Sequence, residues 1–204
     1  RMEAGSEPYQ CRCQIPPRIR PLCHDGGVIR LGKATVSSGL ADAVYAERGG
    51  RITFATDSYT GNLKTDGDEN SHIRTTILKS MRGDALGHVG MKLGAKASWE
   101  GSASSLTDLT LGNDSVWHVG RAGDIRLPVL SGSNGNIHMN RGGGDLSVGS
   151  LEGKAGFSFE RDAADATRIL GGTVIIDKAA AGSIVTIFTD RTGLESAEEA
   201  VMQK

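Results

Sequence analysis

From Val28 onward, the chain is built of short apolar clusters separated by Gly, Asn, Asp and Ser. Most clusters alternate apolar and polar positions with period two, and they are rich in β-branched residues. This pattern predicts short β-strands, each with one buried face, joined by turns. The clusters lie at residues 52–54, 73–77, 89–93, 109–111, 116–119, 137–139, 146–148, 157–159, 174–176 and 185–188.

The clusters recur about every twenty residues. The step is 21 residues from Ile52 to Ile73 and again from Val116 to Ile137. In a β-sandwich, the strands of hairpins would recur at roughly 8–12 residues. A repeat of about twenty residues made of strands and turns instead predicts an all-β solenoid, a right-handed parallel β-helix over residues 27–194 with roughly eight or nine rungs.

The two ends of the chain lack this pattern. Residues 1–26 hold four of the five prolines and almost no alternation, which predicts a disordered leader. Residues 195–204 contain no Gly and are rich in helix formers, with acids first and Lys204 last. They predict a short helical linker.

Composition narrows the classes of function. The chain has 204 residues, with 38% hydrophobic residues, 23% charged residues and 29 Gly, which fits one folded domain with many corners. With 23 Lys and Arg against 24 Asp and Glu, the net charge is -1. Neither nucleic acid nor an anionic membrane is therefore an expected partner, and no cofactor is expected.

No metal site is predicted. The three cysteines, Cys11, Cys13 and Cys23, lie in the predicted leader next to His24, but they lack the paired spacing that tetrahedral zinc sites favour. Residues 66–70 (DGDEN) begin like a calcium loop. The Gly and Glu that an EF-hand needs further along are missing, so a solvated turn is the expected structure.

Three segments carry motifs that recur in one family of exported proteins. Residues 41–50 (ADAVYAERGG) resemble the rung N-A-V-Y-A-x-G-G, with Asp42 in place of Asn. Residues 99–117 are similar to a W-x-G motif followed by L-x-L-x-N-x-S-x-W, and residues 146–159 (LSVGSLEGKAGFSF) are similar to L-x-V-x-x-L-x-G-x-G-x-F. Over residues 40–194 the chain thus resembles the pertactin-like passenger domains of bacterial autotransporters, which belong to type V secretion.

The resemblance implies a non-catalytic function. Such passengers are β-helical rods that a C-terminal membrane β-barrel exports, and no such barrel follows in this sequence. The expected protein is a stalk or adhesin-type segment, displayed on the bacterial outer membrane or secreted, with a host-cell surface or matrix protein as its partner. The alternative is a secreted β-helix enzyme, active on polysaccharides or proteins, whose catalytic part is mostly missing.

The last matching segment also implies a role in folding. In this family it folds first and templates the rest of the rod, so residues 146–194 are expected to form an autochaperone-like end. Three of the four phenylalanines lie here, which predicts the largest buried area per residue. The residues expected to form the folding core are Leu146, Val148, Leu151, Gly153, Gly156, Phe157 and Phe159.

One tripeptide suggests a binding site. Arg82, Gly83 and Asp84 form the sequence that integrins read in matrix proteins, and pertactin-like adhesins can display it. Because it lies between two apolar clusters, it is expected in a loop. A chance match at an ordinary charged corner is the alternative.

The candidate catalytic residues do not form a convincing set. Ser115 lies near His118, with His138 one repeat later, but the Gly-Asp-Ser-Gly setting of serine protease passengers is missing. The two histidines are expected side by side on adjacent rungs, facing outward. Of the later acidic residues, only Asp145 and Asp165 are spaced by about one repeat. No catalytic residue is therefore predicted.

Overall fold

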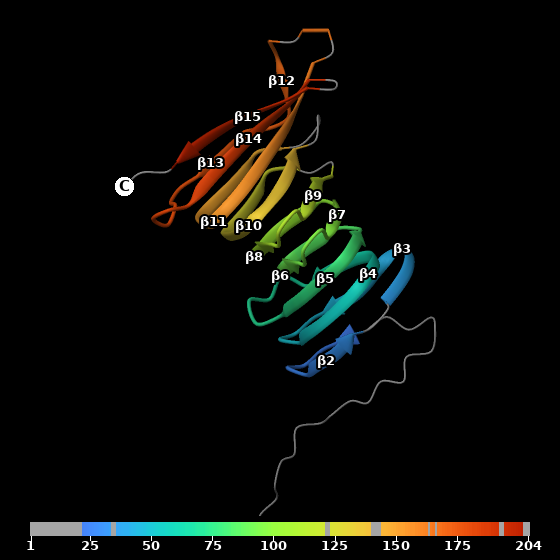
Figure 1. The fold of residues 1–204 in the computed structure, drawn as a ribbon. Helices are drawn as coiled ribbons and strands as arrows, with labels where there is room; N and C mark the ends of the chain where they lie inside the picture. The colour runs from blue at the N-terminus through green and yellow to red at the C-terminus, as the bar shows by residue number, and fades with distance from the viewer. Residues whose placement is uncertain are drawn as a thin grey trace, which may run out of the picture.

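The computed structural model describes residues 22–33, 36–120, 123–139, 144–162, 164–165, 167–191 and 194–201 (Figure 1). This part of the chain contains strands and turns but no helix, and so none of its segments is a helix that could cross a membrane. Most strand pairs are parallel and join residues about one turn apart. The chain is a parallel β-helix, which confirms the predicted fold class.

The strands are β1 (Leu22–Cys23), β2 (Val28–Lys33), β3 (Val36–Ala46), β4 (Arg51–Thr65), β5 (His72–Arg82), β6 (Ala85–Leu93), β7 (Ser98–Gly101), β8 (Ala103–Leu111), β9 (Val116–Val119), β10 (Ile125–Met139), β11 (Leu146–Arg161), β12 (Ile169–Leu170), β13 (Val174–Ile176), β14 (Ile184–Arg191) and β15 (Leu194–Val201).

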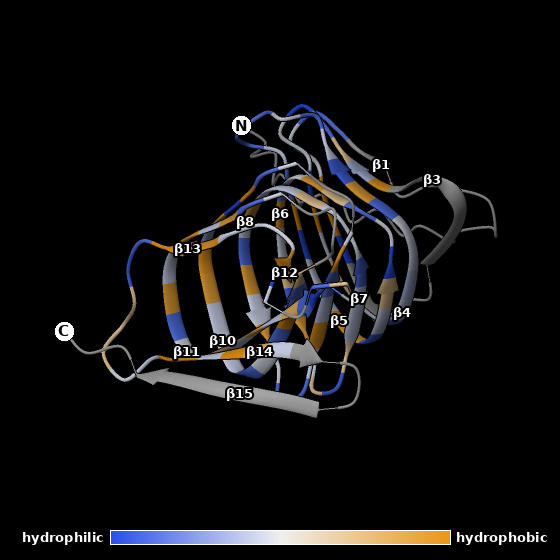
Figure 2. Cartoon of the chain, turned by 90° about the horizontal axis from the view of Figure 1, so that it is seen from above, coloured by the Kyte–Doolittle hydropathy of each residue, from blue (hydrophilic) through white to orange (hydrophobic). Residues whose placement is uncertain are grey.

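Each regular turn has three strand segments, which we name faces A, B and C. In β4, face A is residues 51–56, face B is 58–60 and face C is 62–65. Each segment pairs in parallel with its equivalent in the next turn, so that like residues stack along the rod. In the view down the rod, hydrophobic and hydrophilic bands alternate along the strands (Figure 2). This is the period-two pattern of strands with one buried face.

The inward positions of face A form one continuous column. It consists of Phe54, Thr75, Met91, Leu109, Leu130, Leu151 and Ala179, and at its N-terminal end the backbone of Leu31 pairs with that of Phe54. From Phe54 to Leu151 the column makes about five regular turns, with one less regular step at each end. The predicted eight or nine rungs are therefore too many. The prediction placed rungs over all of residues 27–194, whereas the regular turns run only from Phe54 to Leu151, and the step beyond them, from Leu151 to Ala179, is 28 residues.

The inward column of face B holds the largest buried side chains. Its fully buried members are Tyr59, Met81, Trp99, Trp117, Ile137 and Phe157. The rings of Trp99 and Trp117 stack with centroids 4.4 Å apart and planes 5° from parallel. Each indole Nε1 donates to a glycine carbonyl of the preceding corner, Trp99 to Gly83 at 2.8 Å and Trp117 to Gly101 at 3.0 Å. The buried N–H groups are thus satisfied.

Glycines occupy the corner between faces B and C. Gly61, Gly83 and Gly101 follow one another there in successive turns. Gly83 has φ +134°, and a Cβ on it would overlap the carbonyl oxygen of Gly61. A Cβ on Gly101 would in turn overlap the carbonyl oxygen of Gly83. The turns approach so closely at this corner that only glycine fits.

The C-terminal strand corrects one prediction. The backbone of β15 pairs antiparallel with β14 from Leu194 to Val201, so the helix predicted over residues 195–204 is wrong for 195–201, and 202–204 lie outside the described residues. A parallel β-helix ends on an exposed strand edge, which offers a row of backbone donors and acceptors. Pairing with that edge outweighs the weak helix propensity of the segment.

The burial of the C-terminal end also differs from the prediction. Phe157 is 1% exposed, but Phe159 and Phe188 are only partly buried. The two largest fully buried side chains, Trp99 and Trp117, lie nearer the middle of the rod. The expectation that this end buries the most area per residue is therefore wrong. Of the expected folding core, Leu146, Val148, Leu151 and Phe157 do lie in the interior.

At the other end, strand structure begins inside the predicted leader. Residues 1–21, with Cys11 and Cys13, lie outside the described residues. The two residues of β1, Leu22 and Cys23, pair in parallel with β3.

Candidate functional site

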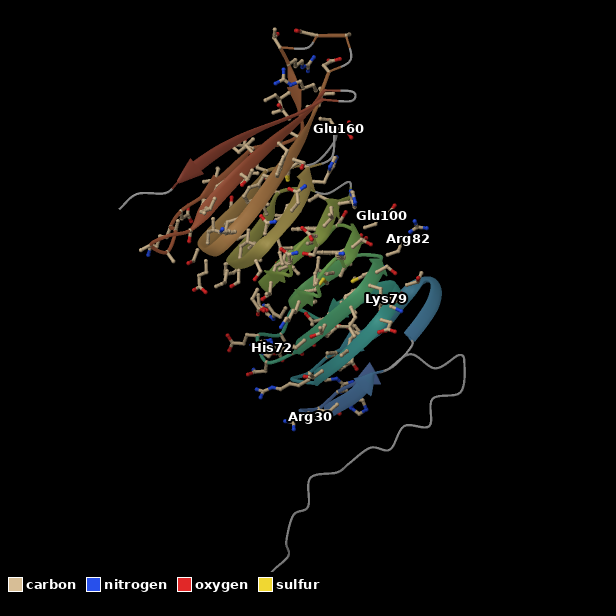
Figure 3. All side chains as sticks on the ribbon, in the orientation of Figure 1. Arg30, His72, Lys79, Arg82, Glu100 and Glu160 are labelled. Carbon is tan, nitrogen blue, oxygen red and sulfur yellow. The ribbon has the colours of Figure 1, made fainter. Side chains whose placement is uncertain are left out.

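The outer surface of face B carries a ladder of polar residues. We call the inward column of face B, from Tyr59 to Phe157, the aromatic column. The residue that follows each of its members in the chain points outward, and in successive turns the outward position is occupied by Thr60, Arg82, Glu100, His118, His138, Ser158 and Phe188. Arg82, Glu100 and Glu160 project along one side of the rod, and Arg30 and His72 along another (Figure 3). Toward the C-terminal end this ladder turns from charged residues to imidazole, hydroxyl and aromatic groups.

The C-terminal half of the ladder lines a hollow on the described surface. This cleft, which we name the His118 cleft, has a volume of about 480 Å³. Its walls come from β9, β10, β11 and β14 and from the turns before β9 and within β10. The lining residues are Asp114, Ser115, Val116, His118, Asn134, Gly135, Asn136, His138, Gly156, Ser158, Thr186, Phe188 and Thr189.

The two histidines lie side by side in the cleft, which confirms their predicted position on adjacent rungs. The rings of His118 and His138 have centroids 5.4 Å apart. Burial lowers the pKa of His118, the His138 ring lowers it further, and Glu100 opposes both effects. His138 Nε2 lies 3.7 Å from the carboxylate of Glu160. At neutral pH, His118 is therefore an uncharged imidazole with one donor and one acceptor nitrogen.

The floor of the cleft is a fixed polar pair beside an aromatic ring. Asn136 Nδ2 donates to Ser158 Oγ at 2.5 Å, and Ser158 is only 8% exposed. The Oδ1 of Asn136 is buried and has no hydrogen-bond partner among the described residues. Gly156 lies between Asn136 and Phe188, since a Cβ there would come within 2.8 Å of Asn136 Oδ1 and 2.9 Å of Phe188 Cε2. The missing side chain at Gly156 makes room for both groups.

The integrin-type tripeptide lies at the glycine corner between faces B and C. The Arg82 guanidinium pairs with Glu100 of the next turn, at 2.8 Å from Nη2 and 3.0 Å from Nε. The Asp84 carboxylate accepts a hydrogen bond from the backbone N–H of Ser102 at 2.8 Å. Arg82 is exposed, but Gly83 and Asp84 are half-buried in the stack. Integrin binding by this tripeptide stays a prediction, and its carboxylate has a structural role in the corner.

The other residues that the sequence suggested as catalytic or metal-binding candidates also stabilise turns. Ser115 is fully buried and its hydroxyl donates to the carbonyl of Gly112 at 2.9 Å, so it caps a corner. The acidic turn at 66–70 uses its carboxylates on backbone N–H groups, as where Arg48 donates to Asp66 at 2.8 Å. These bonds hold the pKa of Asp66 below its usual value.

Asp145 is also part of a corner stack. Its backbone N–H donates to the carboxylate of Asp124 at 3.1 Å, and its own carboxylate accepts from the N–H of Thr173 at 2.6 Å. Asp165 instead accepts from Thr167 in a local turn, so the two acids do not share a site. Among the described residues, no group of three or more His, Cys, Asp and Glu is placed to hold a metal ion.

A second hollow lies on the outer surface of face A. Its volume is about 310 Å³, and it is lined by Arg51, His72, Arg74, Thr53 and Thr107 around the backbone of β4 and β5. Burial lowers the pKa of His72, and the charges of its neighbours His88, Arg51 and Arg74 add to that effect. This hollow is basic, whereas the His118 cleft is not.

Sequence reasoning singled out Ser115 and the two histidines, which all line the cleft, but did not identify its other walls. Asn136, Gly156 and Phe188 lie in different strands, and no local motif joins them. One signal was present, because Gly156 stands inside a regular strand pattern, where glycine often marks a close approach of neighbouring groups.

Comparison with protein-family models, with curated protein sequences and with solved structures found no match to this chain. The resemblance to autotransporter passengers therefore stays a prediction.

Proposed function

We propose that this chain is a non-catalytic rod that displays a binding surface, namely an adhesin-type segment of an autotransporter passenger. In this proposal it acts outside the bacterial cell, on the surface or after secretion. The observation that carries it is the position of the residues behind the sequence resemblance. Trp99, Trp117, Leu146 and Phe157 all point into the core and stack with their equivalents in neighbouring turns.

Side chains that point into the core hold the turns of the rod together and do not reach a substrate. A motif made of inward side chains builds turns of constant width, which extend the rod and fix its outer surface. The serine and the acidic residues that could have served catalysis are engaged in corners instead. A rod with outward ladders of polar side chains suits recognition of a partner along its length.

The test is binding of the purified chain to cultured epithelial cells and to immobilised matrix proteins. We expect saturable binding at micromolar concentration or below, and no new reducing ends or peptide fragments when the chain is incubated with polysaccharides or proteins. Absence of binding would contradict the adhesin function for this segment. Cleavage of any substrate would contradict its non-catalytic nature and favour the alternative, a secreted β-helix enzyme.

A pair of variants examines the integrin-type tripeptide separately. Arg82→Ala removes the exposed guanidinium, and Lys79→Ala removes another exposed cation, which lies in the same strand, β5, and also pairs with an acid, Asp57, at 3.4 Å. If the tripeptide mediates adhesion, only Arg82→Ala lowers binding to integrin-bearing cells. Equal binding by both variants would assign adhesion to another part of the surface.

A further inference from the structure

We propose that the His118 cleft binds a linear, uncharged glycan that lies along the rod across several rungs. This inference rests on the displayed-rod function proposed above and names the class of ligand for one site on it. The cleft volume, about 480 Å³, is within the range of small-ligand sites and suits a few sugar units.

The chemistry of the lining favours a polyhydroxylated ligand. Imidazoles, hydroxyls and amides all accept and donate hydrogen bonds, as sugar hydroxyls do. The groups that can reach a ligand in this way are His118, His138, Asn134, Thr186 and Thr189. Thr189 is itself held by Arg161, whose guanidinium donates to its Oγ1 at 2.9 Å. The groups come from three rungs, those of β9, β10 and β14, and the rung of β11 lies between the last two, so a ligand that uses them all must extend along the rod.

Phe188 supplies an apolar wall. Its ring is half-buried, and the absence of a side chain at Gly156 lets it lie close to Asn136. The C–H face of a pyranose can pack on such a ring while its hydroxyls, at the ring edge, bond to the polar groups around it. A purely hydroxylic cleft would lack this apolar contact, and a purely aromatic one would lack the hydrogen bonds.

The charges around the cleft disfavour an anionic ligand. The guanidinium of Arg161 contacts the lining residue Thr189, but none of the described residues that line the cleft is itself Lys or Arg, and Asp114 contributes a carboxylate. A second carboxylate, Glu160, lies 3.7 Å from His138. The arginines of face A line the other hollow, so a sulfated or uronic glycan would be attracted there and not to the His118 cleft.

The periodicity of the site matches the periodicity of the ligand. Equivalent positions on successive turns are about 4.8 Å apart, which is close to the rise of one sugar unit in an extended glycan. His118 and His138 are such equivalents, and so are Asn136 and Gly156. Successive sugar units can therefore lie over successive rungs, and the contribution of each unit adds to that of the next.

The experiment uses calorimetric titration of the whole chain at pH 7 with cellohexaose, xylohexaose, mannohexaose and chitohexaose. Hexagalacturonate and a heparin hexasaccharide serve as anionic counterparts. We expect at least one uncharged oligosaccharide to bind, and the anionic ones to bind at this cleft more weakly or not at all. No binding of any uncharged oligosaccharide at about 5 mM, or equal binding of charged and uncharged ones at this cleft, would overturn the inference.

Variants of the cleft residues, together with the NMR signals of the histidine rings, test where on the chain the glycan binds. We expect His118→Ala and His138→Ala to weaken binding roughly 3- to 10-fold each, and Phe188→Ala to weaken it by about tenfold. His72→Ala is the matched control, because His72 and His88 form a similar pair with centroids 5.8 Å apart. In the unaltered chain, the glycan should shift the imidazole NMR signals of His118 and His138 and leave those of the other pair unchanged. A shift of the other pair alone would overturn the inference even if a variant failed to fold.

The two proposals fail in different ways. A chain that binds cells but none of the uncharged glycans would overturn the inference about the cleft and leave the displayed rod standing. A chain that shortens the glycan it binds would overturn the non-catalytic function and leave the glycan site standing.

Discussion

Replacing Trp117 by alanine should remove a large part of the stability of the middle of the rod. The side chain is fully buried, its ring stacks on Trp99 at 4.4 Å, and its Nε1 donates to the carbonyl of Gly101. Loss of a buried Trp side chain costs about 3–5 kcal/mol, within which the stacked pair accounts for about 0.5–1.5 kcal/mol. The carbonyl of Gly101 keeps its bond from the N–H of Gly120 at 2.9 Å, so no buried acceptor is orphaned.

Two further variants separate the contribution of the buried Trp117 ring from that of its hydrogen bond and of the outward neighbour. Trp117→Phe keeps an aromatic ring and loses the hydrogen bond and part of the ring, so we expect a cost of about 1–2 kcal/mol. His118→Ala changes the next residue of β9, whose side chain points outward, and should cost less than about 0.5 kcal/mol. The free energies come from urea unfolding followed by circular dichroism.

Hydrogen exchange tests where the stability is lost. In a stacked array each turn contacts only its neighbours, so protection should fall first in β7, β9 and the part of β10 that pairs with β9. A cost below about 1 kcal/mol for Trp117→Ala, or a loss of protection spread evenly over the rod, would refute the argument that the aromatic column holds these turns together.

Three other outcomes follow from the corners and the histidine pair. Gly83→Ala should cost more than about 3 kcal/mol in urea unfolding, because the position has φ +134° and its Cβ would overlap the carbonyl oxygen of Gly61. Asp84→Ala should cost about 1–3 kcal/mol in the same assay, since it removes the charged acceptor of the Ser102 N–H. For His118, the folded state lowers the pKa, so the unfolded chain binds its proton more readily. The free energy of unfolding should therefore fall as the pH drops through about 6.5 and level off below the folded pKa, and His118→Gln should reduce this dependence.

The solenoid could be predicted from the sequence because stacking imposes a period. Ile52 and Ile73 are 21 residues apart and are partners in adjacent turns, as their spacing indicated. The number of turns could not be predicted in the same way. Turns in this rod differ in length at their corners, and a corner can lengthen without disturbing the inward columns.

The C-terminal strand was missed for a related reason. The composition of residues 195–204 favours a helix when the segment is considered alone. The open edge of β14 is a property of the whole rod, and it appears only when all the turns are stacked. A local propensity of a few tenths of a kcal/mol per residue is outweighed by a row of backbone hydrogen bonds along that edge.

The His118 cleft shows how this fold separates stability from recognition. Along β9, β10 and β11, each outward residue of the cleft is next to an inward residue of the aromatic column, as His118 is to Trp117 and Ser158 is to Phe157. The inward neighbours are locked by stacking, so they hold the outward side chains in fixed register. Exposed outward residues such as His118 can change at little cost in stability, because they are not part of that stack. A binding site on this face therefore has a rigid backbone and exposed side chains that can differ in chemistry, and a displayed recognition surface requires both.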